Sequence, residues 1–228
     1  TIPTGFARWV EPLGSWLDPP RRRRSPRSSN GTRVADEVLP TLPDLTQPHS
    51  VHVIGVGGAG MSAIATVLAG MGHTVSGSDL RESQGLARLR AQGVTVHIGH
   101  EPENLADDLE LVTLSTAVPR SNLEVKVAGE RGIPVLRRAE ILAAIAATRD
   151  TVAVAGTHGK TTTSSLLALV LIEAGLHPSF VIGADVNEIG SGAVWGDGDV
   201  FVFEADESDG TFLELPRRAA IVTNTKMP

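Results

Sequence analysis

From residue 50 onward, the chain alternates between short apolar runs and longer segments that carry apolar residues on one face. The short runs predict strands and the longer segments predict helices. Alternation at this spacing predicts an α/β fold in which a parallel sheet is covered on both faces. The predicted strands are Val51–Val56, Thr74–Ser78, Val94–Ile98, Leu109–Ser115, Pro134–Leu136, Thr151–Ala155, Ser179–Ile182, Val200–Glu204 and Ala219–Thr223. The predicted helices are Met61–Met71, Leu86–Gln92, Leu123–Arg131, Ala139–Ala147 and Lys160–Ala174.

Residues 1–48 do not continue this pattern, because prolines recur throughout them beside the run Arg21–Arg24. Proline removes a backbone donor and blocks helices, so we predict a mostly disordered tail. The arginine run is interpreted as part of a solvated linker, or as foreign sequence, in preference to a patch for anionic surfaces. A new strand–turn–helix cycle begins near Arg149–Asp150, which divides the remainder into predicted domains at 49–149 and 150–228.

The composition narrows the class of protein. The chain has 228 residues, of which 41% are hydrophobic and 20% are charged, as in an ordinary globular protein of one or two domains. Its net charge of −6 disfavours nucleic acid as a partner. The absence of cysteine excludes disulfides, thiolate zinc sites and thiol catalysis, and it fits a reducing cytoplasm, where we expect the protein to act. No apolar run has the roughly 18 residues of a membrane span, so no membrane insertion is expected.

A glycine-rich turn connects the first predicted strand to the first predicted helix. Residues Gly55–Gly60 fit the pattern G-x-G-x-x-G, and Asp79 follows at the end of the second strand. In this pattern the glycines allow a tight turn and a close backbone approach to a pyrophosphate, which the helix N-terminus attracts. Asp79 is placed to accept hydrogen bonds from a ribose or a ring N–H. The turn predicts a diphosphate site, but NAD, FAD and UDP-sugars all carry that group.

A second glycine turn connects Thr151–Ala155 to the helix that begins at Lys160. Its sequence, G-x-x-G-K-T-T, is a shortened form of the phosphate loop. The loop amides and Lys160 suit the β- and γ-phosphates of a nucleoside triphosphate, and the Thr161 hydroxyl suits a bound Mg²⁺. A dehydrogenase has no need of such a loop, so the pattern favours an enzyme that uses ATP on a ligand held by the first loop. The residues predicted to bind ATP are Gly156, Thr157, His158, Gly159, Lys160, Thr161 and Thr162.

Carboxylates follow the predicted strand that ends at Glu204. Asp206, Glu207 and Asp209 continue the acidic run. Because parallel strands end at the same edge of a sheet, this run is expected beside the phosphate loop. Carboxylate oxygens are ligands that Mg²⁺ prefers, so the strand end is a candidate metal site.

Taken together, these segments resemble the Mur ligase family, whose members build the peptidoglycan precursor with ATP. The resemblance implies a Rossmann-like parallel-sheet domain that binds a UDP-sugar, followed by a truncated P-loop-type α/β domain that binds ATP. The G-G-A-G-M form of the first loop favours the members that add L-alanine over those that recycle a tripeptide. The segments that carry the resemblance are 55–62, 76–79, 98–100, 156–163 and 204–209, within a similar region from about Val51 to Asn224.

The resemblance also implies a reaction, the ligation of L-alanine to UDP-N-acetylmuramate through an acyl phosphate. Lys160 would stabilise the negative charge that develops, and His158 would orient substrate or phosphate. Thr161 and Glu204 would be the ligands of Mg²⁺. The residues implied for the UDP-sugar are Gly57, Gly58, Ala59, Gly60, Met61, Ser62, Asp79, Ser115 and Ala117.

The sequence departs from the family after Asn224, where Thr225–Pro228 stand in place of a Glu-Pro-Asp-His stretch. The rest of the central domain and a C-terminal domain have no counterpart, so we expect an incomplete and inactive fragment. Three alternatives stay open: a UDP-sugar-binding module without turnover, an NAD-dependent oxidoreductase, and a phosphate-loop NTPase with another partner.

Overall fold

The computed structural model describes residues 42–186, 189–205 and 218–224, which belong to one compact unit, Thr41–Pro228. Most of the predicted tail and the acidic run after Ala205 lie outside the described residues. At the described end of the tail, Leu45 is buried in the core. Across the described ranges, the helices are all too short or too polar to cross a membrane.

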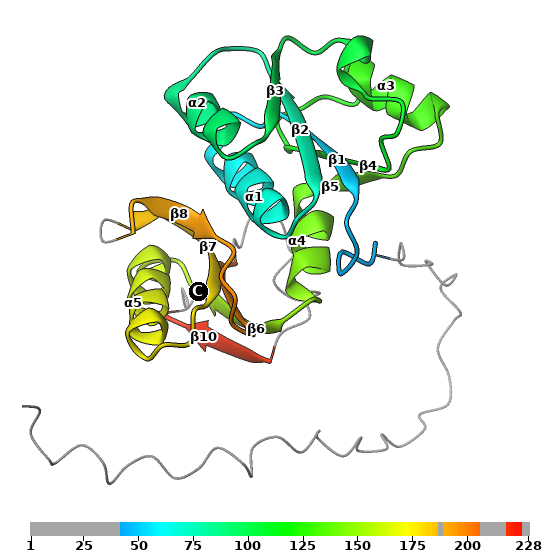
Figure 1. Ribbon diagram of the computed structural model, residues 1–228. Coiled ribbons are helices and arrows are strands. Elements are labelled where there is room, and N and C mark those ends of the chain that lie inside the picture. The colour runs from blue at the N-terminus through cyan, green and yellow to red at the C-terminus, as the bar shows by residue number, and fades with distance from the viewer. Residues whose placement is uncertain (1–41, 187–188, 206–217, 225–228) are drawn as a thin grey trace, which may run out of the picture. The chain divides into compact units, whose positions relative to one another are not determined.

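The first sheet confirms the predicted parallel architecture. Its five strands are all parallel and lie in the order β3-β2-β1-β4-β5, with helices on both faces (Figure 1). This order places the turn after β1 where neighbouring connections leave in opposite directions, the usual position of a ligand site in such sheets. The strands are β1 (Ser50–Ile54), β2 (Thr74–Asp79), β3 (Thr95–Ile98), β4 (Leu111–Leu114) and β5 (Val135–Arg137). The helices are α1 (Ala59–Gly70), α2 (Gln84–Ala91), the 3₁₀ helix η2 (Pro102–Asn104), α3 (Leu123–Glu130) and α4 (Arg138–Ala146).

The second sheet has the order β10-β6-β9-β7-β8 and is mixed. Four strands are parallel, but β8 runs antiparallel to β7, so the prediction of a parallel sheet is wrong at this edge. The connection between the two strands, residues 187–190, is too short for a crossover, and a short connection joins antiparallel neighbours. The elements are β6 (Asp150–Ala155), α5 (Lys160–Glu173), β7 (Ser179–Val186), β8 (Ser191–Val194), β9 (Val200–Glu204) and β10 (Ala219–Val222).

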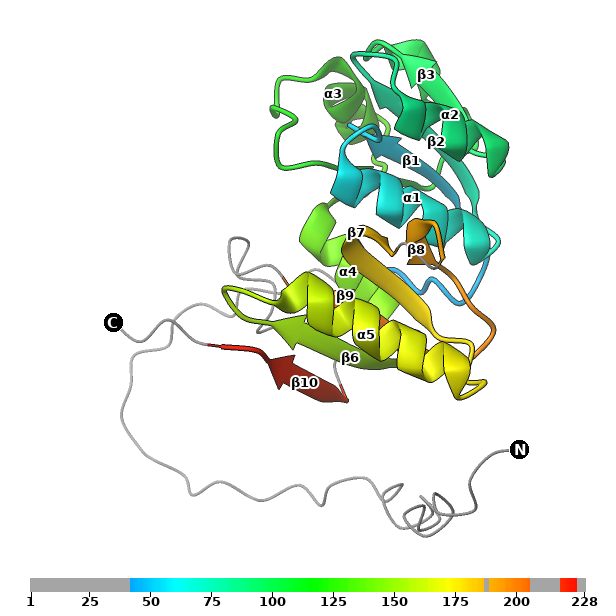
Figure 2. The same cartoon turned by 90° about the vertical axis from the view of Figure 1, so that its left-hand side faces the viewer.

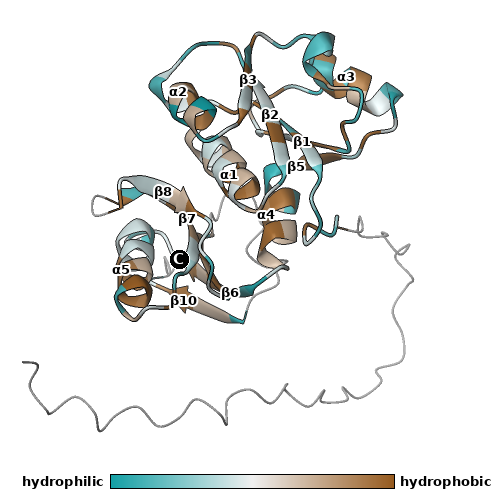
Figure 3. Cartoon of the chain, viewed as in Figure 1, coloured by the Kyte–Doolittle hydropathy of each residue, from teal (hydrophilic) through white to brown (hydrophobic). Residues whose placement is uncertain are grey.

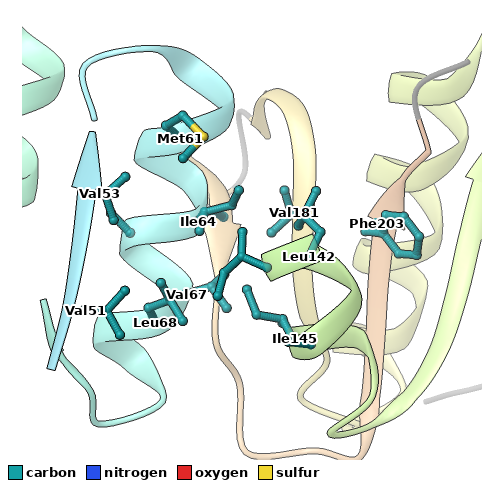
Figure 4. Close-up of a cluster of buried hydrophobic side chains, with 14 of the residues drawn as sticks. Val51, Val53, Met61, Ile64, Val67, Leu68, Leu142, Ile145, Val181 and Phe203 are labelled. Carbon is teal, nitrogen blue, oxygen red and sulfur yellow. The ribbon is translucent and has the colours of Figure 1, made fainter. Parts of the chain in front are cut away.

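One hydrophobic cluster contains residues from both sheets. Helices α1 and α4 supply Ile64 and Ile145, which lie in the same cluster as Val53 of the first sheet and Phe203 of the second (Figure 4). Helix α4 is buried along most of its length, and Figure 3 shows it as largely apolar. A helix that is apolar all round needs cover on all sides, and its place between the sheets in Figures 1 and 2 supplies it. The shared core therefore fixes α1, and the turn before it, against the second sheet.

A buried polar network lies behind β1 and β2. Glu124, in the first turn of α3, is fully buried and accepts hydrogen bonds from the Ser78 hydroxyl at 2.6 Å and the Asn104 amide at 2.7 Å. Nδ1 of His100 lies 3.1 Å from the carboxylate, and Nε2 of the buried His52 lies 3.7 Å from it. Burial raises the pKa of Glu124, but His52, Ser78 and Asn104 outweigh it, and the net pKa lies below its ordinary value. The network thus holds a carboxylate in the core.

The buried His73 is expected to make the stability of the fold depend on pH in mild acid. The backbone N–H of His49 donates to Nδ1 of His73 at 3.0 Å, so this nitrogen must stay unprotonated. Burial, and then the charge of His49, hold the pKa of His73 below its usual 6.5. Since the folded state binds fewer protons, this contribution to stability is complete above pH 6.5 and is lost as pH falls through the lowered pKa. We therefore expect the urea concentration at the midpoint of unfolding to be lower at pH 5.5 than at pH 7.5.

The substitution His73→Asn tests this assignment, because the Asn side chain offers an acceptor near the position of Nδ1 and does not titrate. Its urea midpoint is expected to depend less on pH than that of the parent chain. If the urea midpoints of the two proteins changed with pH by the same amount, His73 would not be the cause of the acid sensitivity.

Candidate functional site

The first glycine turn is tied to the end of β2. Gly55 adopts a left-handed φ of +80°, and the N–H groups of Gly55 and Val56 both donate to the Ser78 carbonyl. The Gly57 N–H donates to Oδ2 of Asp79 at 2.8 Å. A Cβ added to Gly57 would lie 2.8 Å from the same oxygen, so a side chain here would displace the Asp79 carboxylate from the turn. Asp79 therefore orders the turn, and its contact with a nucleotide stays a prediction.

The other residues predicted to bind the UDP-sugar lie in two places, at the start of α1 and in the turn after β4. Gly58 is the N-cap of α1, so the amides of Ala59 and Gly60 have no acceptor within the helix and are available to an anion. Met61 is buried, so its side chain belongs to the core. Ser115 and Ala117 lie in the turn after β4, next to β1, where the Ser115 N–H donates to the Ile54 carbonyl. The Ser62 hydroxyl donates to the Ala59 carbonyl.

The second glycine turn has the backbone of a phosphate loop. Gly156 and Gly159 have left-handed φ values of +127° and +80°, and α5 begins at Lys160. The Lys160 ammonium donates to the Gly156 carbonyl at 2.7 Å, which holds it over the loop. The first-turn amides of α5 point out of the N-terminus of the helix. The Lys160 ammonium, these amides and the helix dipole therefore attract phosphate to the same place. The imidazole of His158 is exposed, and its predicted orienting role stays a prediction.

Thr161 and Glu204, the two residues predicted as metal ligands, lie beside one another. The Thr161 hydroxyl donates to Glu204 at 3.3 Å. The Ser164 hydroxyl lies 2.9 Å from the other carboxylate oxygen and 2.6 Å from the Lys160 carbonyl. A Cβ added to Gly183 on β7 would lie 2.8 Å from this carboxylate, so glycine leaves space around it. Hydroxyl and carboxylate oxygens fit Mg²⁺, which takes its remaining ligands from phosphates and water. The described ranges hold no group of three or more His, Cys, Asp or Glu side chains able to bind a metal by itself.

A cavity of about 780 Å³ joins the two loops. Gly57, Gly60 and Ser62 line it from the first turn, and Lys160 and Glu204 line it from the second. The structure therefore brings part of the predicted diphosphate site and part of the predicted triphosphate site into one space. Asp79, Ser115 and Ala117 do not line this cavity.

Several residues at the site were not predicted. Arg138 lines the cavity, and its Nε lies 2.9 Å from where a Cβ on Gly60 would stand. Ser164 holds Glu204, and Asn224 contacts the phosphate loop. Polar residues that follow a strand in a parallel sheet, as Thr223 and Asn224 follow β10, are the sequence signal that identifies such a residue.

Comparison with known sequences supplies an independent view. A family model described as "Mur ligase family, catalytic domain" matches residues 50–150. The chain is 52% identical over 174 residues to the UDP-N-acetylmuramate–L-alanine ligase of Allorhizobium ampelinum and 55% identical over 175 residues to that of Acidothermus cellulolyticus. These alignments cover 76% and 77% of this chain but 37% and 36% of the relatives. The chain thus spans little more than a third of the length of these curated relatives.

Solved structures show the same similarity. The crystal structure of UDP-N-acetylmuramate:L-alanyl-gamma-D-glutamyl-meso-diaminopimelate ligase from Neisseria meningitides aligns with a TM-score of 0.71 at 29% identity, over 80% of this chain and 62% of that chain. The UDP-N-acetylmuramate-alanine ligase of Thermotoga maritima aligns with a TM-score of 0.70 at 33% identity, over 78% of this chain and 41% of that chain. Both agree with the predicted α/β fold.

Proposed function

Because this chain belongs to the Mur ligase family, we propose that it forms the substrate- and nucleotide-binding part of an enzyme that joins L-alanine to UDP-N-acetylmuramate with ATP in peptidoglycan synthesis. The observation that carries the proposal is the cavity lined by both the first glycine turn and Lys160 with Glu204. A UDP-sugar whose diphosphate lies at α1 can extend through this cavity toward a triphosphate at α5.

The proposed chemistry has two steps. A carboxylate oxygen of the sugar substrate attacks the γ-phosphorus of ATP, ADP leaves, and an acyl phosphate forms. The amine of L-alanine then attacks the acyl carbon and displaces phosphate. Lys160 and the N-terminus of α5 offset the negative charge that develops on the transferred group.

Thr161 and Glu204 are the residues that would hold Mg²⁺, whose charge, when it is bound, further offsets that of the phosphates. The Ser164 hydroxyl, which lies 2.6 Å from the Lys160 carbonyl, also lies 2.9 Å from the second carboxylate oxygen of Glu204, and the first oxygen is the one beside Thr161. The ligand pair is therefore ordered by the protein's own hydrogen bonds.

The choice of L-alanine as the amino acid rests on sequence similarity. The two curated alanine ligases compared above are 52% and 55% identical to this chain, and the solved alanine ligase is 33% identical, whereas the solved ligase for a tripeptide is 29% identical. The same similarity favours a ligase over the NAD-dependent oxidoreductase that the first turn alone suggests.

Calorimetry on the chain tests the proposal. We expect binding of UDP-N-acetylmuramate and of ATP with Mg²⁺, and none of NADH. Binding of NADH without UDP-N-acetylmuramate would contradict the proposal and support the oxidoreductase. Phosphate release in the presence of ATP, Mg²⁺, UDP-N-acetylmuramate and L-alanine then tests whether this chain carries out the reaction by itself.

The substitution Gly57→Ala is expected to weaken UDP-N-acetylmuramate binding about tenfold. The added Cβ would meet the Asp79 carboxylate at 2.8 Å, disrupt its bond to the Gly57 N–H and obstruct the approach of the diphosphate. Gly129→Ala on α3 is the matched control, because its Cβ meets nothing within 4 Å. Calorimetry measures both variants, and equal affinities would show that the turn does not bind the diphosphate.

A further inference from the structure

The residues that follow β10 are hydrogen-bonded to the phosphate loop. Oδ1 of Asn224 accepts from the backbone N–H groups of Thr157 at 3.0 Å and His158 at 3.2 Å. Nδ2 of Asn224 donates to the His158 carbonyl at 3.1 Å. The Thr223 hydroxyl lies 2.6 Å from that same carbonyl and 3.2 Å from the Ala155 carbonyl. One carboxamide and one hydroxyl therefore engage the backbone on both sides of the turn.

Gly156 makes this contact possible. A Cβ added at this position would lie 3.0 Å from both the backbone nitrogen and the backbone oxygen of Asn224, and it would clash with the Thr223 hydroxyl. The left-handed φ of Gly156 is a second reason for glycine. The first glycine of the loop thus serves the close approach of the chain after β10, while Gly159 serves the start of α5.

The contacts separate the loop into two halves. The second half, with the Lys160 ammonium and the first amides of α5, carries the groups that attract phosphate. The first half, Thr157 and His158, has its amides directed to Asn224. We infer that Asn224, assisted by Thr223, is a positioning residue that holds the phosphate loop in its binding shape before the nucleotide arrives.

This inference rests on the proposed function, and it specifies how the ATP site of that function is preorganised. A loop that is already ordered loses less conformational entropy when it binds a ligand, so removal of Asn224 should weaken binding. The opposite arrangement, in which Oδ1 blocks amides that ATP needs, predicts the opposite sign. In that case removal of the side chain would strengthen binding.

The experiment measures dissociation constants for ATP with Mg²⁺ and for tripolyphosphate by calorimetry on the chain. Asn224→Ala removes all three side-chain bonds, and we expect about tenfold weaker binding of both probes. Asn224→Asp keeps an acceptor for the two amides but sets a carboxylate against the His158 carbonyl and adds negative charge beside the phosphates. We expect it to weaken binding at least as much as Asn224→Ala.

Thr223 offers a matched pair of variants. Thr223→Ser keeps the hydroxyl and is expected to bind ATP as the parent does, whereas Thr223→Val keeps the shape, loses the hydroxyl bonds and is expected to bind several-fold more weakly. Circular dichroism and the affinity for UDP-N-acetylmuramate report whether each variant is folded, and we expect both to be unchanged. If Thr223 and Asn224 only supported the fold, their substitution would lower the circular dichroism signal, the affinity for UDP-N-acetylmuramate and the affinity for ATP together.

The possible outcomes distinguish a failure of the positioning role from a failure of the proposed function. Unchanged or tighter ATP binding by Asn224→Ala, in a parent chain that binds ATP, would overturn the positioning role alone. A parent chain that binds neither ATP nor tripolyphosphate would overturn the proposed function and this role with it.

Discussion

Replacement of Lys160 by methionine is expected to weaken ATP binding by roughly 10- to 100-fold, since a charge-assisted hydrogen bond contributes about 1.5–3 kcal/mol. The ammonium is held over the loop by the Gly156 carbonyl at 2.7 Å, so its position is set before the triphosphate binds. Methionine has a similar length and no charge, so the substitution removes the cation and preserves most of the packing.

Lys126→Met is the control, because Lys126 is exposed on α3 and has no place in the cavity. Its ATP affinity should equal that of the parent. Calorimetry of both variants with ATP and with UDP-N-acetylmuramate makes the comparison specific, since only ATP binding by Lys160→Met should change. A loss of both affinities would indicate that Lys160 supports the fold instead of the phosphates.

The sequence was sufficient to predict the elements that local pattern determines. The strands of the first sheet are short segments bounded by turns, and their parallel order follows from the helices between them. The strand β8 was missed because Ser191-Gly192-Ala193-Val194 is short and only four residues separate it from β7, so no helix sets it apart as a separate strand. Gly192 approaches the backbone carbonyls of Ile182 and Ala184, so this strand depends on pairing with β7. Such pairing is a tertiary property that local propensity does not report.

The same division holds at the candidate site. The two glycine turns were predictable because phosphate binding requires particular backbone geometry over a few consecutive residues. What orders each turn comes from elsewhere in the chain: Asp79 bonds to the Gly57 amide, and Asn224 bonds to the amides of Thr157 and His158. These contacts join neighbouring strand ends, and they become visible only once the strand order is known.

Truncation of Glu124 to alanine is expected to lower the free energy of unfolding by about 3–5 kcal/mol, because it leaves the partners of a buried charge without their acceptor. Ser78 and Asn104 would lose hydrogen bonds of 2.6 and 2.7 Å, and His52 would lose the carboxylate 3.7 Å from its Nε2. The Asn122 cap and the start of α3 also favour a negative charge at this position. Urea denaturation followed by circular dichroism measures the change.

Glu130→Ala on the same helix is the control, since Glu130 is exposed and its loss should change stability by less than about 0.5 kcal/mol. Equal, small effects of the two substitutions would mean that water replaces the buried carboxylate. Glu124→Gln should lie between them, because an amide keeps the shape and an acceptor but loses the charge.

The pH dependence of these variants distinguishes lost charge from lost packing. The pKa of Glu124 lies below its ordinary value of 4.5 in the folded protein, so the folded state binds fewer protons than the unfolded chain. Its contribution is complete above pH 4.5 and is lost as pH falls through the lowered pKa. Glu124→Gln should therefore lose part of the parent's acid sensitivity in this range. Because Ser78 also accepts the Gly55 and Val56 amides through its carbonyl, the same variant should weaken UDP-N-acetylmuramate binding more than Glu130→Ala does.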